Sequence, residues 1–241
     1  AVLGGIQPQP LPFNPRGELV QDQVNQAIKP DDFHFARTQL VCLENTQGGK
    51  VLSSDYLNQF GAFVKSKHLR FHLDGARVFN AAVRQNVPVK AITGLFDSVS
   101  ICLSKGLGCP AGSLLVSDAV TIQKARRYRK MLGGGMRQVG IIAASGMFAL
   151  QHHVDRLEID HRNASNLGDA LSQLEHISLA EPVQTNMVML DLSGVDVKRL
   201  QAFLLKREIQ ISGPRLVTHL DISAEDIEVI IGAFRQFEEA G

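Results

Sequence analysis

Short apolar runs alternate with helical patterns through the first hundred residues of this chain. Three runs have the length and alternation of strands, at residues 39–43, 69–73 and 98–103, and helical patterns lie between them at 53–67 and 78–85. Strands that alternate with helices of this length need crossover connections, which favour a mostly parallel sheet. The sequence therefore predicts an α/β fold.

The pattern changes in the last third of the chain. A long helical stretch at 138–166 is followed by three apolar runs and two helices, in the order strand 186–192, helix 196–207, strands 208–211 and 216–219, and helix 224–239. This order is typical of an α+β unit. We therefore expect a large domain at residues 1–155, with a mostly parallel sheet and crossover helices, and a small α+β C-terminal domain at 156–241.

Charged side chains follow the expected parallel strands. Glu44, Asp74 and Lys105 all fall at or just beyond strand ends, and ligands of open α/β sheets bind beyond the carboxyl ends of the strands. Either Lys105 reaches solvent there, or it is an amine nucleophile toward an aldehyde. Asp74 precedes a glycine, so it is either a turn residue or one member of a site with Arg77, three residues further on.

Five motifs in this order resemble the low-specificity threonine aldolases, a family of fold-type I pyridoxal phosphate enzymes. They are LENT, HLDGARVFNAA, SKGLGCPAGSLL, RKMLGGGMRQVGIIAA and RLVTHLDIS, and Lys105 follows Asp74 by 31 positions. The resemblance covers nearly the whole chain. It implies cleavage of L-threonine, L-allo-threonine and related β-hydroxy-α-amino acids to glycine and an aldehyde.

The resemblance also implies roles for individual residues. Lys105 would bind the aldehyde of pyridoxal phosphate, and Asp74 would pair with the pyridine nitrogen of that cofactor. Arg77 would lie near the ring hydroxyl and the substrate carboxylate. Arg215 would bind the same carboxylate, for which a guanidinium offers bidentate geometry.

The basic stretch before the glycines at 133–135 has two interpretations. Without the resemblance, the RRYRK run is most simply the solvated face of a helix. With it, Lys130 and Arg137 match residues near the cofactor phosphate, which they would reach across a subunit boundary. The family resemblance therefore implies a homo-oligomer, arranged as a dimer of dimers.

Two departures from the family pattern bear on whether the chain is active. Gln47 follows LENT, where the family has a histidine near the substrate hydroxyl, and a glutamine cannot accept that proton near neutral pH. The chain also starts after the N-terminal segment of the family, which suggests an incomplete sequence. The alternative function is a shortened, catalytically weak or inactive chain that acts as a partner subunit.

Composition narrows the remaining choices. The 25 basic and 24 acidic residues nearly cancel, which argues against a nucleic-acid or membrane partner and favours a small-molecule substrate. The three cysteines lack CxxC spacing, which argues against a metal site and favours a cytoplasmic protein. Among the histidines, we expect His72 in the core or a second layer, His153 at the surface and His219 in support of Arg215.

Overall fold

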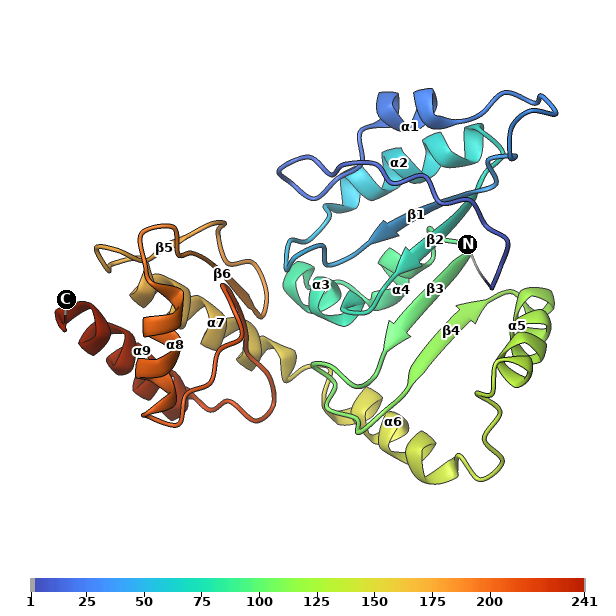
Figure 1. The fold of residues 1–241 in the computed structure, drawn as a ribbon. Coiled ribbons are helices and arrows are strands. Elements are labelled where there is room, and N and C mark those ends of the chain that lie inside the picture. Colours follow the sequence, from blue (N-terminus) through green and yellow to red (C-terminus); the bar gives the residue numbers. More distant parts are fainter. Residues whose placement is uncertain (1–2, 241) are drawn as a thin grey trace.

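The computed structural model describes residues 3–240, which form two lobes of unequal size (Figure 1). The larger lobe contains α1 (Gln21–Ala27), β1 (Leu40–Glu44), α2 (Ser54–Ser66), β2 (Arg70–Asp74), α3 (Val78–Gln85), α4 (Val89–Thr93), β3 (Ser98–Cys102), β4 (Ser113–Ser117), α5 (Ala119–Met131) and α6 (Gly140–His152). The smaller lobe contains α7 (Leu157–Leu171), β5 (Ser178–Leu179), β6 (Met187–Asp191), α8 (Val197–Leu205), β7 (Arg215–Val217) and α9 (Ala224–Glu239).

The sheet of the larger lobe has the order β1-β2-β3-β4. Strands β1, β2 and β3 are parallel, and β4 is antiparallel to β3. The register places Glu44 beside Asp74, and Asp74 beside Ser100. The predicted α/β fold with a mostly parallel sheet is therefore confirmed, and the three carboxyl ends meet at one edge.

Only one face of this sheet is packed into a core. On that face the side chains of β1, β2 and β3 are buried, namely Val41, Leu43, Phe71, Leu73, Val99 and Ile101. They form one apolar cluster with residues of α2 and α3, including Phe60, Val64 and Val78. Because side chains alternate between faces along a strand, the intervening residues point to the opposite side.

The opposite face carries polar and thiol side chains. They are Cys42, Glu44, Arg70, His72, Asp74, Ser98, Ser100 and Cys102, all of them partly or fully exposed. His72 lies among them, half-buried, with its Nδ1 2.8 Å from Oγ of Ser98. This polar face leads to the strand ends that carry the candidate site.

The smaller lobe is built on a three-stranded antiparallel sheet of order β5-β6-β7. Its apolar cluster is separate and includes Leu171, Val188, Leu200 and Phe234. The strand expected at 208–211 is wrong, because this stretch is irregular in the structure. Ile209 and Ile211 nevertheless pack against the cluster, which explains the apolar alternation without strand pairing.

The single helix expected at 138–166 is also wrong, because α6 and α7 are separated by a break at residues 153–156. No proline or glycine lies in this break, so tertiary packing must cause it. Val154 and Leu157 turn into a small apolar cluster with Leu103 and Leu107, the residues that flank Lys105 in the chain. The domain boundary at 155 and 156 stays a prediction, which the separate apolar clusters of the two lobes support.

Candidate active site

The strand ends are held in place by backbone hydrogen bonds across the edge of the sheet. The backbone N–H of Asn45 donates to the carbonyl of Asp74 at 3.1 Å, and that of Gly75 donates to the carbonyl of Ser100 at 2.8 Å. A Cβ on Gly75 would lie 2.9 Å from that same carbonyl. The DGAR sequence therefore needs its glycine so that Asp74 and Arg77 can stand beside β3.

Lys105 lies in a tight turn directly after β3. The N–H of Gly108 donates to the carbonyl of Lys105 at 2.8 Å, and the N–H of Cys109 donates to the carbonyl of Leu103 at 3.1 Å. Gly108 has a φ of +71°, a conformation that favours glycine. The turn exposes the lysine while it buries Leu107 beneath it.

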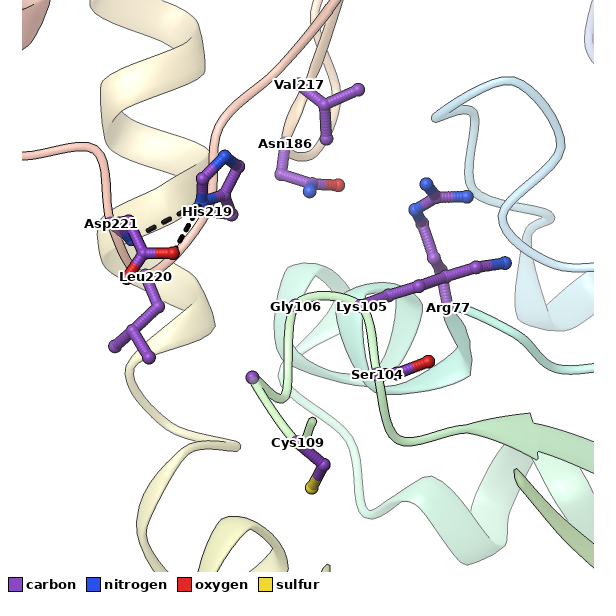
Figure 2. Close-up of a pocket in the computed structure, with 11 residues that line it drawn as sticks. Arg77, Ser104, Lys105, Gly106, Cys109, Asn186, Val217, His219, Leu220 and Asp221 are labelled. Carbon is purple, nitrogen blue, oxygen red and sulfur yellow. Dashed lines mark hydrogen bonds and ion pairs between the residues drawn. The ribbon is translucent and has the colours of Figure 1, made fainter. Parts of the chain in front are cut away.

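A cavity of about 330 Å³ lies between the two lobes beside this turn. The larger lobe contributes Arg77, Ser104, Lys105, Gly106, Gly108 and Cys109, and the smaller lobe contributes Asn186, Val217, His219, Leu220 and Asp221. Figure 2 shows Lys105 and Arg77 on one side, and His219 and Asp221 on the other. Residues that are far apart in the sequence therefore line the same cavity.

The charges around this cavity interact with one another. Burial lowers the pKa of Arg77, and the nearby Arg215 lowers it further, while Glu44, Cys102 and Asp74 act in the opposite direction. Burial raises the pKa of Glu44, as does Asp74, against the effect of Arg77 and Lys105. Asp74, Arg77 and Lys105 thus lie within electrostatic range of Glu44, and Arg215 lies within that range of Arg77. Of these predicted site residues, Arg77 and Lys105 line the described cavity, whereas Asp74 and Arg215 do not. Two guanidinium groups within electrostatic range of each other favour a bound anion.

Lys130 and Arg137 do not join this group. Lys130 lies in the last turn of α5, and Arg137 follows that helix, both with exposed side chains. Figure 1 shows α5 beyond β4, at the outer edge of the sheet. In the described chain, neither residue lines the cavity beside Lys105.

Gln47 lies in a turn in which its backbone N–H and carbonyl both bond to Lys50. Its side chain faces Gly17, where an added Cβ would come within 3.1 Å of Oε1 of Gln47. Gln47 does not line the described cavity.

Two residues of the smaller lobe, His219 and Asn186, also line the cavity. The Nδ1 of His219 accepts a hydrogen bond from the N–H of Asp221 at 3.3 Å. Its support of Arg215 stays a prediction. Asn186 was missed. Its Nδ2 donates to the carbonyl of Thr218 at 2.9 Å, and its buried Oδ1 has no hydrogen-bond partner among residues 3–240. The only signal for Asn186 was a polar residue at the start of an apolar strand.

The described residues hold no membrane-spanning helix and no cluster of metal ligands. No helix within residues 3–240 has the length and hydropathy of a bilayer span. Over the same range, no three His, Cys, Asp or Glu side chains are grouped so that they could hold a metal ion.

Comparison with known proteins places this geometry in a family. Residues 1–194 match the family model described as beta-eliminating lyase. The low specificity L-threonine aldolase of Escherichia coli (strain K12) is 45% identical over 240 residues, which are 98% of this chain and 72% of that protein. Low-specificity L-threonine aldolase 1 of Arabidopsis thaliana is 35% identical over 252 residues, covering 98% of this chain and 70% of that protein.

A solved structure agrees with the fold. The threonine aldolase of Leishmania major superposes with a TM-score of 0.76 at 19% identity, over 93% of this chain and 69% of that one. At this identity the match concerns the fold alone. The family model and the two sequence relatives show that the chain belongs to the beta-eliminating lyase family and, within it, to the low-specificity L-threonine aldolases.

Proposed function

We propose that this chain uses pyridoxal phosphate to cleave L-threonine, L-allo-threonine and related β-hydroxy-α-amino acids into glycine and an aldehyde. The observation that carries this proposal is an amine, a carboxylate and a guanidinium group at the carboxyl edge of the parallel sheet, with a second guanidinium group from the smaller lobe within electrostatic range. Lys105, Asp74, Arg77 and Arg215 supply these groups. Family membership supports the reaction.

The residues present fit the cofactor. Lys105 offers an exposed amine for its aldehyde, and Asp74, at the same edge of the sheet, offers an anion for a protonated ring nitrogen. The buried Oδ1 of Asn186, which has no partner in the described residues, could accept a hydrogen bond from a bound molecule. Bound pyridoxal phosphate supplies an electron sink for the electrons of the breaking Cα–Cβ bond.

The protein residues have three tasks in this reaction. Arg77 and Arg215 bind the substrate carboxylate, so the Cα–Cβ bond is held in one orientation relative to the cofactor ring. The negative charge of Asp74 keeps the ring nitrogen protonated. The turn around Lys105 holds its side chain at the cavity, where the amine would bind the aldehyde group of the cofactor.

A second copy of the chain is part of this proposal. Helix α6 is apolar, yet only Gly146 and Ala149 are buried in it, and Ile141 is 88% exposed. Helix α5 has no buried residue among those described. A neighbouring subunit that covers this side would bury these apolar groups. Lys130 and Arg137 of this chain would then lie near the cofactor phosphate in the site of that neighbouring subunit. We therefore propose a homo-oligomer, arranged as a dimer of dimers.

We also propose the cytoplasm as the compartment. The three cysteines are all free in the structure, and free thiols persist in a reducing compartment. This part of the proposal is independent of the chemistry at Lys105.

Covalent trapping tests the central claim. The protein is mixed with pyridoxal phosphate and reduced with borohydride, and the modified lysine is mapped by mass spectrometry. We expect the label at Lys105, and we expect glycine and acetaldehyde from L-threonine. Lys130 is the internal control for nonspecific labelling of an exposed amine. A label spread evenly over both lysines, without acetaldehyde formation, would contradict the proposal.

A further inference from the structure

His153 contacts the turn that carries Lys105. It is the first residue after α6, and its Nδ1 lies 2.7 Å from the backbone carbonyl of Leu107. Because a carbonyl only accepts hydrogen bonds, Nδ1 must carry the proton and donate it. His153 is half-buried in this position. The surface role expected from the sequence is therefore wrong.

The carbonyl that His153 binds belongs to the turn itself. Leu107 lies between Lys105 and Gly108, whose carbonyl and N–H close the turn at 2.8 Å. The side chain of Leu107 is only 3% exposed, so it is fixed in the small cluster with Leu103 and Leu157. With both its side chain and its carbonyl held, Leu107 has little freedom to rotate. The backbone of Lys105 is constrained in the same way.

Other contacts attach this turn to the junction between α6 and α7. An added Cβ on Gly106 would lie 2.9 Å from Cδ2 of Leu157, in the first turn of α7. The thiol of Cys109 lies 3.5 Å from the carbonyl of Ser145, in α6. These are packing contacts and one weak sulfur hydrogen bond. Among the described contacts between the turn and the junction, the bond from His153 is the short polar one.

We propose that His153 is a positioning residue for Lys105. Its imidazole N–H fixes the Leu107 carbonyl and so holds the lysine turn against the junction of the two lobes. The catalytic part of this inference rests on the proposed function, since it concerns the amine that would bind the cofactor. The structural part does not, because the hydrogen bond joins two groups of the chain itself.

Two substitutions separate the hydrogen bond from the packing of the ring. His153 makes an edge-on contact with Phe148, with ring centroids 5.4 Å apart. His153→Phe keeps an aromatic ring there and removes the donor. His153→Asn loses the ring, but its amide N–H₂ can occupy nearly the place of Nδ1–H and donate to the same carbonyl. His152→Ala, at the exposed neighbouring residue, is the matched control.

The thiol of Cys109 reports on the turn without any cofactor. It is buried, whereas Cys42 is exposed and serves as an internal reference for the labelling reaction. We expect His153→Phe to raise the alkylation rate of Cys109, relative to that of Cys42, by about tenfold, since an unpaired carbonyl favours local opening. His153→Asn and His152→Ala should leave this ratio within about twofold of the unchanged protein.

The catalytic readout uses the same variants after addition of pyridoxal phosphate. We expect His153→Phe to lower kcat for L-threonine about tenfold with little change in KM, because Arg77 and Arg215 are untouched. For His153→Asn, we expect kcat to stay close to that of the unchanged protein. If His153→Asn opened the turn while His153→Phe did not, ring packing would be the cause and the inference would be overturned. Absence of turnover in every variant, with Cys109 responding as expected, would instead refute the proposed function alone.

Discussion

The two faces of the β1-β2-β3 sheet have opposite compositions, although they are made by the same fifteen residues of three strands. One face is apolar and packed against α2 and α3, with Leu73 fully buried in its middle. The other face carries Glu44, His72 and Asp74, and it leads to Lys105. Because side chains alternate along a strand, each strand contributes to stability with every second residue and to the candidate site with the residues between.

This difference predicts two separable classes of variants. Substitutions on the apolar face should lower the free energy of unfolding, whereas substitutions at the strand ends of the polar face should lower activity. A side chain at the site is partly exposed, so its replacement should change the free energy of unfolding only slightly. Variants chosen from each face can confirm or break this separation.

The largest effect is expected for Lys105→Ala. Loss of the amine removes the only covalent attachment in the proposed mechanism, so kcat for L-threonine should fall by more than about a thousandfold. The midpoint of thermal unfolding without cofactor should stay within about 2 °C, because the side chain is exposed. Acetaldehyde release and calorimetry measure the two quantities. A large loss of stability would show that the lysine turn belongs to the core.

The next largest effect is expected for Phe71→Ala, and it concerns the free energy of unfolding rather than activity. Phe71 is 1% exposed, and its ring lies 4.1 Å from that of Phe96 and 5.8 Å from that of Phe60 between centroids. Its removal leaves a cavity and should lower the free energy of unfolding by about 3–5 kcal/mol. Urea denaturation measures this loss. Phe33→Ala is the control, since Phe33 is 93% exposed. Equal losses in both variants would contradict the assignment of the core face.

Much of this separation could be predicted from the sequence. The alternation in 39–43, 69–73 and 98–103 indicated the strands, and the chain positions of Asp74 and Lys105 placed both at one edge of a parallel sheet. Local pattern and tertiary structure agree there, since each strand carries its own apolar face. The family motifs then supplied roles for Arg77 and Arg215, which the structure brings within electrostatic range of each other.

The contributions of the α6–α7 junction and the smaller lobe could not be predicted in this way. His153 lies in a helical pattern without any break signal, and its role depends on a carbonyl 46 residues away in the chain. Asn186 lies in the cavity wall only because the smaller lobe packs beside the Lys105 turn. Such contacts depend on how separate units pack, and a periodic pattern within one segment carries no information about that.

An intermediate effect is expected for Arg215→Lys, at the edge of the smaller lobe. The substitution keeps the positive charge but loses the planar pair of N–H donors that suits a carboxylate. We expect KM for L-threonine to rise by about 10- to 100-fold, with a smaller fall in kcat. Steady-state kinetics measure both values. Arg235→Lys, on the exposed side of α9, is the matched control. An unchanged KM would remove Arg215 from the substrate site.

The smallest effect is expected for Glu44→Gln, and it depends on pH. Burial and Asp74 raise the pKa of Glu44 above its ordinary value of 4.5, so the folded protein holds this proton more tightly than the unfolded chain does. The charged carboxylate therefore costs some stability at neutral pH, and this cost disappears as the pH falls below the ordinary value. Glu44→Gln should raise the unfolding midpoint slightly at pH 7 and leave it unchanged near pH 4. Thermal unfolding across this range measures the difference, with Glu228→Gln on the exposed side of α9 as the control for loss of one negative charge. A stabilisation that persisted at pH 4 would show that shape, rather than charge, limits packing on the polar face.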